Sequence, residues 1–458
     1  MLINSIKEAL TGIVGKDRYQ DAPEILICYA YDAFFEEALP EAVLFPITTQ
    51  EVAGIVQVAG RHKIPITARG AGTSICGGPI PLEGGIVLCL SKMNRIIEVN
   101  TRDRYAIVQP GVINGDLQKA LTSNRFFFPP DPGSMNFSTI GGNVALNAGG
   151  PRCLKYGVTA DYVLSMEVVL ATGKVIRFGS RNVKDVTGYK LAALFCGSEG
   201  TLGIVTEITV RVMPMPEAVQ TMMVTFADLN QTAECVSDII GSGVLPVAIE
   251  LMDKATINML EDALNSGLPR EAAGVLIIEV DGMAAACEQE KKLIEQIVAR
   301  HGATSIVTAQ NEAERNHLWQ ARRAAYGVFA KLAPDIVSED VTVPVSKVPK
   351  MIEIINTTIA EYQLLGGVLA HAGDGNMHPF VCADRSNTDE WERVNAAYKK
   401  IYTAAAELGG TLSGEHGIGL AKSQYMPLVM DDDSRAFLQL IKKTLDPGNI
   451  LNPGKLIG

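Results

Sequence analysis

The sequence predicts an α+β protein whose two parts differ in their pattern of secondary structure. Up to residue 214, short β-like runs dominate and there is no regular alternation with long helices. From residue 217 onward, strands and helices alternate. The segment Met213-Pro214-Met215-Pro216 separates the two parts, because two prolines cannot continue a strand. The length of 458 residues fits two or three domains.

The first part begins with a helix, since apolar residues recur at helical spacing from Leu2 to Ile13. A strand at 42–45 follows. The next helix begins after Thr48, which forms a capping box with Glu51. A strand at 64–68 then leads into a glycine-rich loop. Further strands are predicted at 85–90, 106–109, 163–170 and 203–213.

The second part has the strand and helix order of a ferredoxin-like antiparallel sheet. Its predicted strands are 222–226, 247–252, 274–280 and 367–370. The predicted helices are 232–241, 254–264, 287–301 and, near the end of the chain, 432–445.

Composition excludes several classes of function. The net charge of −11 lacks the basic footprint that nucleic-acid binding needs. No apolar run reaches the length of roughly 18 residues that a membrane span requires. None of the 8 cysteines lies in a Cys-x-x-Cys motif, which argues against a zinc ribbon or an iron–sulfur cluster. The N-terminus shows no signal pattern, so we expect free thiols and a cytoplasmic protein.

Glycine is the local excess that needs an explanation, with 13 glycines in residues 69–150. The loop 69–78 allows backbone N–H groups to approach an anion, although it matches neither GxGxxG nor the Walker A pattern. A tight turn between strands is the alternative. Residues 129–150 form a long segment rich in glycine, proline and asparagine, in which Ile140 and Val144 indicate packing inside the protein.

Two short segments concentrate histidine. His371 and His378 flank Asp374-Gly375, a hairpin turn signal, and Glu415 precedes His416 in a glycine-flanked loop. Two histidines and a carboxylate form a ligand set for a divalent metal, with purely structural histidines as the alternative. Arg322 offers a fork for a carboxylate, or belongs to a solvated helix face.

The combination of these motifs resembles one flavoprotein family, and the similarity extends from about residue 40 to 454. The motifs lie at 69–78, 197–205, 371–378, 413–419 and 446–454. In this combination the chain resembles flavoproteins of the vanillyl-alcohol oxidase (p-cresol methylhydroxylase) fold. Within that fold it is similar to the branch of D-lactate dehydrogenases and glycolate oxidase flavin subunits.

The resemblance implies a domain organisation. We expect a two-subdomain FAD-binding domain of the p-cresol methylhydroxylase type at 1–216, with its core from about 38. A ferredoxin-like cap domain with a metal site is expected at 217–420, and a C-terminal segment at 421–458 that returns to the FAD domain.

The resemblance also implies FAD as the cofactor, bound non-covalently because the first loop contains no histidine. The glycine-rich loop would then hold the pyrophosphate. The residues expected to contact the cofactor are Arg69, Gly70, Ala71, Gly72, Thr73, Ser74, Gly77, Gly78, Asp131, Pro132, Ser134, Thr139, Gly141, Gly142, Asn143, Ala148, Gly149, Glu199, Gly203, Ile204, Val205 and Asn452.

In the second half of the chain, the resemblance assigns a chemical role to each candidate residue. His371, His378 and Glu415 would hold one divalent ion, zinc, manganese or iron. His416 would act as the base, pointing away from Glu415 if the backbone is extended. The substrate carboxylate would be bound by Arg322, assisted by Lys331.

These roles imply oxidation of a D-2-hydroxy acid to the 2-oxo acid, with hydride transfer to flavin N5. D-lactate is favoured, because Phe380 indicates a small, apolar pocket. The alternatives are a glycolate oxidase or D-2-hydroxyglutarate dehydrogenase flavin subunit, or a catalytically silent FAD-binding electron-transfer subunit. The electrons would pass to a partner, an electron-transferring flavoprotein or an iron–sulfur subunit.

Overall fold

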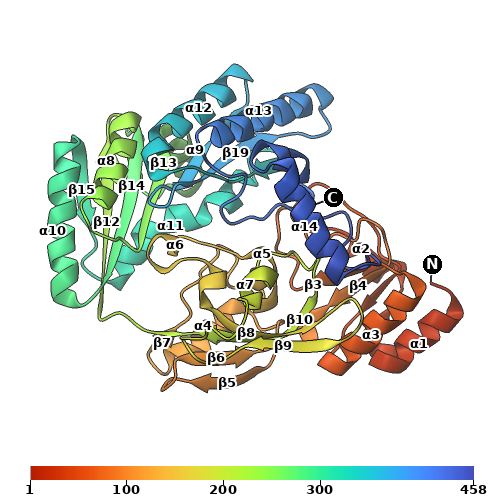
Figure 1. Cartoon of the computed structure of the whole chain (residues 1–458). Helices are drawn as coiled ribbons and strands as arrows, with labels where there is room; N and C mark the ends of the chain where they lie inside the picture. The colour runs from red at the N-terminus through yellow and green to blue at the C-terminus, as the bar shows by residue number, and fades with distance from the viewer. Residues whose placement is uncertain (1, 458) are drawn as a thin grey trace. The chain divides into compact units, whose positions relative to one another are not determined.

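The structure, a computed structural model, describes residues 2–457 and shows two compact units (Figure 1). The first unit contains the chain up to residue 149, residues 158–215 and the chain from 415 onward. The second unit contains residues 150–157 and 216–414. Residues 150–157 therefore group with the second unit and residues 415–420 with the first, whereas the sequence placed them the other way round.

One subdomain of the first unit is a four-stranded mixed sheet in the order β1 (Tyr19–Gln20), β2 (Ala42–Leu44), β4 (Ile86–Cys89) and β3 (Ile66–Arg69). β4 runs parallel to both β2 and β3. The helices α1 (Asn4–Val14) and α3 (Thr49–His62) supply the apolar face that buries this sheet. The hydroxyl of Thr48 accepts the Glu51 N–H, so the predicted cap of α3 is confirmed.

The other subdomain is a five-stranded antiparallel sheet in the order β5 (Ile96–Asn100), β6 (Tyr105–Val108), β10 (Ile204–Arg211), β8 (Val163–Val169) and β9 (Val175–Gly179). Part of the segment predicted as irregular is a short helix, α5 (Ile140–Leu146). Ile140 and Val144 on α5 are fully buried, which explains the apolar residues in that segment. The remaining elements of the unit are α2 (Pro23–Ile27), α4 (Asn114–Thr122), β7 (Phe126–Phe127), α7 (Leu191–Phe195), β11 (Met213–Pro214) and α14 (Asp432–Leu445).

The end of the chain joins the mixed sheet of this unit. Leu451 forms a parallel bridge with Ile66 on β3, and Asn452 donates its backbone N–H to the Ile66 carbonyl. Ile450 and Leu451 are buried in the core between α3 and the sheet.

The second unit is an eight-stranded sheet with helices packed against it (Figure 1). Its first four strands have the ferredoxin-like order 4-1-3-2, all antiparallel, which confirms the predicted packing. In sheet order the strands are β15 (Ala303–Thr308), β12 (Ala218–Phe226), β14 (Gly274–Gly282), β13 (Ala248–Asp253), β18 (Leu365–His371), β19 (Asn376–Ala383) and β16 (Asp335–Ser338), with β17 (Val341–Thr342) paired to β19. The helices are α6 (Cys153–Tyr156), α8 (Leu229–Gly241), α9 (Lys254–Leu264), α10 (Ala284–Arg300), α11 (Glu312–Phe329), α12 (Val348–Glu361) and α13 (Thr388–Glu407).

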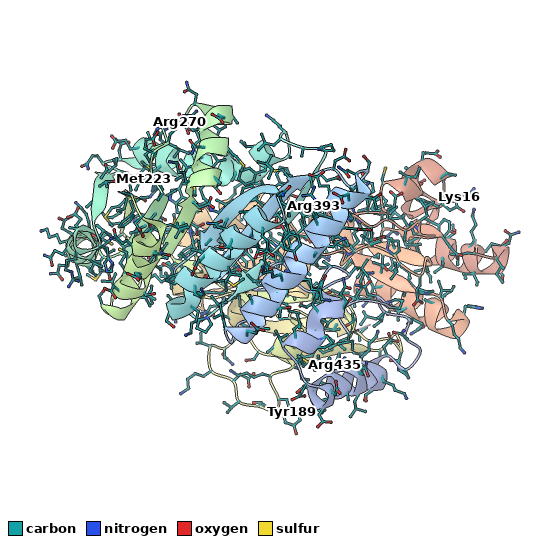
Figure 2. All side chains as sticks on the ribbon, turned by 90° about the horizontal axis from the view of Figure 1, so that it is seen from above. Lys16, Tyr189, Met223, Arg270, Arg393 and Arg435 are labelled. Atoms are coloured by element: carbon teal, nitrogen blue, oxygen red, sulfur yellow. The ribbon has the colours of Figure 1, made fainter. Side chains whose placement is uncertain are left out.

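Polar side chains fasten the helices of this unit to one another. Arg393 on α13, labelled in Figure 2, donates to the carbonyls of Tyr362 and Gln363 at the end of α12. On the edge of the unit, Lys155 and Tyr156 of α6 both donate to Asp281, which explains why 150–157 belongs here. Among residues 2–457, the structure shows no helix long and apolar enough to cross a membrane.

Candidate active site

The glycine-rich loop after β3 presents a row of available backbone donors. The N–H groups of residues 71–75 donate no hydrogen bond to any residue in the described part of the chain. Gly72 has φ +73°, a conformation that glycine adopts without strain. Successive free amides of this kind form a concave anion site. The next two donors are already committed, because the Cys76 N–H binds the Ser74 hydroxyl and the Gly77 N–H binds Asp32.

The first turn of α5 lies directly against this loop. A Cβ added at Gly70 would lie 2.2 Å from the Thr139 Oγ1 atom. The α5 amides are already paired, since the Gly141 N–H binds Pro110 and the Gly142 N–H binds the Thr139 hydroxyl. Asn143 differs, because its buried Nδ2 atom has no hydrogen-bond partner among residues 2–457. A buried donor without a partner beside free amides fits a bound phosphate-containing ligand.

Three predicted cofactor residues join the C-terminal segment to the loops. The Asn452 Nδ2 atom donates to the Gly78 carbonyl at 3.0 Å and to the Glu199 carbonyl at 2.7 Å. The Glu199 carboxylate accepts the backbone N–H groups of Ile418 at 2.8 Å and Gly419 at 2.9 Å. Burial raises the pKa of Glu199 despite these donors. The Glu199 carboxylate therefore fastens the 418–419 backbone.

The other predicted cofactor residues vary in their surroundings. Ile204 packs in the core of the mixed-sheet subdomain, so its side chain is committed there. A Cβ at Gly203 would meet Val168 at 2.5 Å, so glycine is required here by packing against β8. Three of the remaining residues, Asp131, Pro132 and Ser134, lie partly buried in the loop before α5.

The two histidines of the predicted metal set lie on neighbouring strands of one hairpin. His371 pairs with Asn376 across β18 and β19, and His378 lies two residues further along β19, so both side chains project from the same face. Their ring centroids are 4.9 Å apart. The turn between them contains Asp374-Gly375, as predicted.

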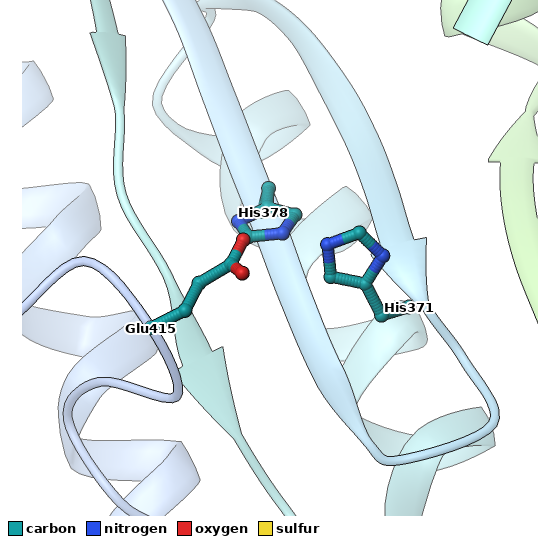
Figure 3. A group of neighbouring side chains, drawn as sticks. All are labelled: His371, His378 and Glu415. Carbon is teal, nitrogen blue, oxygen red and sulfur yellow. The ribbon is translucent and has the colours of Figure 1, made fainter. Parts of the chain in front are cut away.

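Glu415 completes the set, and ligand atoms of the three side chains lie within 4.8 Å of one another (Figure 3). Glu415 follows Gly414, whose N–H donates to the buried carboxylate of Asp340 at 2.6 Å. Ser413 donates its hydroxyl to the same carboxylate. Two nitrogens and one carboxylate oxygen at this separation fit the donor set of a divalent transition metal.

His416 departs from the expected orientation. Its Nε2 atom lies 4.0 Å from the Glu415 Oε1 atom, so the two side chains do not point to opposite sides. The backbone bends at 414–416 and is not extended, which removes the alternation that the prediction assumed. His416 therefore lies next to the candidate metal ligand Glu415.

Glu250 is the residue of this site that sequence reasoning missed. It lies on β13 opposite His371 on β18, and it is fully buried. Its Oε1 atom lies 2.6 Å from His371 Nδ1, and its Oε2 atom accepts the Nε–H of Arg322 at 2.7 Å. Burial raises its pKa, but His371 and Arg322 outweigh burial, so the pKa is lowered and the carboxylate is ionised. The sequence did contain a signal for Glu250, because it is a charged residue in the otherwise apolar predicted strand 247–252. A buried charge needs partners, so such a residue is a candidate for a functional contact.

Arg322 extends from α11 with its outer nitrogens available. Its side chain is 15% exposed, and its two Nη atoms donate to no other residue in the described part of the chain. Trp319, one turn earlier on α11, donates to the buried carboxylate of Glu279 at 2.9 Å and holds the helix on the sheet. Lys331 lies beyond the end of α11 with an exposed side chain, and it is not among the hydrogen-bond partners of Arg322 or Glu250 in the described part of the chain.

Two family models match the chain, one in each half. Residues 40–179 match the FAD binding domain family, and residues 215–456 match the family of FAD linked oxidases, C-terminal domain. The chain belongs to the FAD-linked oxidases. The resemblance identified from the sequence motifs is therefore confirmed, and FAD is the cofactor that this FAD-linked oxidase binds.

Curated relatives of this FAD-linked oxidase cover nearly its whole length. It is 43% identical over 457 residues to glycolate oxidase subunit GlcD of Bacillus subtilis (strain 168), covering 100% of this chain and 97% of the relative. It is 35% identical over 434 residues to a D-lactate dehydrogenase of Anaerostipes hadrus, covering 93% and 91%. Among solved structures, p-cresol methylhydroxylase has a TM-score of 0.84 at 20% identity, covering 99% of this chain and 96% of that chain. This confirms the predicted fold.

Proposed function

We propose that this FAD-linked oxidase oxidises a D-2-hydroxy acid to the corresponding 2-oxo acid. One observation carries the proposal: a single buried glutamate on the sheet, Glu250, joins His371 of the candidate metal set to Arg322 on α11, a side chain suited to bind a carboxylate. A 2-hydroxy acid carries a hydroxyl and a carboxylate on adjacent atoms, which suits such a pair. The names of the relatives, glycolate oxidase subunit and D-lactate dehydrogenase, both describe 2-hydroxy acid oxidation.

The metal site would be formed by His371, His378 and Glu415. A divalent ion there, zinc, manganese or iron, would act as a Lewis acid on the substrate hydroxyl. The free Nη atoms of Arg322 would bind the substrate carboxylate in a bidentate manner. His416 would accept the hydroxyl proton at its imidazole.

The cofactor site would use the free amides of residues 71–75 for the pyrophosphate and the Asn143 side-chain amide as a further donor. FAD bound there supplies the acceptor for the hydride that leaves C2 of the substrate. The loss of one proton and one hydride converts the 2-hydroxy acid to the 2-oxo acid.

D-lactate is the substrate that we favour among the 2-hydroxy acids. Phe380, which follows His378 by two residues, is fully buried and stacks on Phe329 with ring centroids 3.8 Å apart. It offers no polar contact for a second carboxylate, which argues against D-2-hydroxyglutarate. Glycolate stays the second candidate, since the relative from Bacillus subtilis carries that name.

The reduced flavin needs an electron acceptor. The sequence contains no cysteine motif for an iron–sulfur cluster, and the relative is designated a subunit. We therefore propose transfer to a separate protein, an electron-transferring flavoprotein or an iron–sulfur subunit.

Two further expectations from the sequence stay predictions. One is the cytoplasmic location, and the other is the alternative of a catalytically silent electron-transfer subunit.

Anaerobic mixing tests the proposal. Purified FAD-loaded protein is mixed with D-lactate, L-lactate, glycolate and D-2-hydroxyglutarate, and bleaching of the flavin absorbance is followed. D-lactate should bleach the flavin fastest, and a His416→Ala variant should bleach it much more slowly. If none of the four acids bleaches the flavin, the chain is an electron-transfer subunit and the proposed oxidation is wrong.

Removing the metal gives a separate test. Dialysis against a chelator should slow bleaching, and adding back zinc, manganese or iron should restore it. Unchanged bleaching by metal-free protein would contradict the role of His371, His378 and Glu415 as a catalytic metal site.

A further inference from the structure

We infer that Glu250 is a positioning residue that couples the metal ligand His371 to the carboxylate-binding Arg322 and fixes the distance between them. The inference rests on the proposed function, which assigns metal binding to His371 and carboxylate binding to Arg322. The geometry itself, with Glu250 between both side chains, lies entirely within the second unit.

Both carboxylate oxygens of Glu250 are committed to functional side chains. Oε1 lies 2.6 Å from His371 Nδ1 and Oε2 lies 2.7 Å from Arg322 Nε. Glu250 is fully buried, so water does not compete for either oxygen. A buried carboxylate is costly unless its partners hold it, and among the described residues His371 and Arg322 are its hydrogen-bond partners.

The contact with Glu250 determines which nitrogen of His371 binds the metal. Glu250 Oε1 lies 2.6 Å from His371 Nδ1, and a carboxylate oxygen accepts at this distance, so the proton of His371 lies on Nδ1 and Nε2 is left as the ligand atom. Partners of this kind fix the ring orientation and the tautomer of a metal-ligating histidine. Their loss typically lowers metal affinity about 10- to 100-fold.

The contact with Arg322 determines how the guanidinium is presented. Holding the inner Nε–H leaves the outer Nη pair for a carboxylate. The negative charge of Glu250 also lies between Arg322 and the metal ligand His371, so it offsets the repulsion between the arginine and a bound cation. Without it, both the ion and the substrate carboxylate should bind less tightly.

The chain offers a matched control. Glu279, on the neighbouring strand β14, is also a buried carboxylate bound to a side chain of α11, namely Trp319. Its second partner is the Thr221 hydroxyl on β12, and it contacts neither His371 nor Arg322. Glu279→Gln therefore disturbs the same helix and the same sheet without touching the coupled pair.

The experiment compares Glu250→Gln with Glu279→Gln in the FAD-loaded protein. A glutamine oxygen can accept from only one of the two partners while its amide group opposes the other, and the charge is lost. Metal affinity is measured with zinc by competition against a chromogenic chelator. We expect Glu250→Gln to weaken zinc binding about 10- to 100-fold, with wild-type affinity in Glu279→Gln. Thermal unfolding verifies that both variants fold.

Steady-state kinetics with the acid that reduces the flavin provide the second readout. Glu250→Gln should raise KM as well as lower kcat, since the arginine is no longer held. Equal zinc affinity in Glu250→Gln and wild type, or equal losses in both variants, would overturn the inference. If no acid reduces the wild-type flavin while Glu250→Gln still weakens zinc binding, the proposed oxidation fails and the coupling to His371 stands.

Discussion

The close contact between Gly70 and Thr139 gives a sharp test of how the FAD-binding loop is held. A Cβ at position 70 would lie 2.2 Å from Thr139 Oγ1, so the loop or α5 must move by about 1 Å to restore an ordinary contact. Overpacking of this size costs about 1–3 kcal/mol. Gly70→Ala should therefore lower the free energy of unfolding by that amount and weaken FAD binding about 5- to 150-fold if the cost falls on the bound state.

The companion substitution Thr139→Ala identifies the clash as the cause. Alone, it removes the cap of α5 and costs about 1 kcal/mol. In that background the nearest remaining Thr139 atom is Cβ at 3.4 Å, an ordinary contact, so Gly70→Ala should cost little. The four proteins to compare are wild type, Gly70→Ala, Thr139→Ala and the double variant, all loaded with FAD. Urea unfolding measures their stability, and the fluorescence of released FAD measures their affinity for the cofactor. Additive losses in the double variant would refute the contact as the reason for glycine.

Three further outcomes follow from buried polar contacts. Glu199 has a pKa raised by burial above 4.5, so its ionisation destabilises the fold once pH exceeds its folded pKa. The thermal stability of wild type should therefore fall relative to Glu199→Gln as pH rises from 4.5, and a constant difference between pH 4 and 8 would contradict this. Asp340→Ala removes the buried carboxylate that accepts the Gly414 N–H and the Ser413 hydroxyl. It should cost about 1.5–3 kcal/mol, the range for a hydrogen bond to a charged group, and weaken zinc binding through Glu415, measured by melting and chelator competition. Arg322→Lys should raise KM more than it lowers kcat, because an ammonium cannot form the bidentate pair, and an unchanged KM would exclude Arg322 from carboxylate binding.

Periodicity predicted those helices and strands that carry a local signal of their own, whereas the helices α4, α11, α12 and α13 were not predicted. The helix at 432–445 and the cap at Thr48 match the structure, since helical spacing and capping are local properties. The helix α5 was missed because its short span of seven residues contains two glycines, which the sequence pattern indicates as a loop. Here Thr139 caps the helix and burial of Ile140 stabilises it, so tertiary contacts override the weak propensity.

The functional side chains also divide into those that a local sequence pattern predicted and those that depend on tertiary contacts. The hairpin between His371 and His378 was predictable from its turn, and the structure shows both rings on one face. The orientation of His416 was not predictable, because it depends on a bend that the Asp340 contact at Gly414 helps to form. A cross-strand partner such as Glu250 is separated by 121 residues from His371, and no local pattern reports that pairing.

Sheet register is what connects the proposed metal site to Arg322. Glu250 faces His371 because β13 and β18 pair with these residues opposite each other. A slip of one residue would turn Glu250 to the other face of the sheet and bring a neighbouring apolar side chain opposite His371. The eight-stranded sheet therefore contributes more than support, since the register of β13 against β18 selects the acid that sets the histidine tautomer and the arginine position. Substitutions that loosen β13 against β18 should impair zinc binding and substrate binding together, even when no ligand is altered.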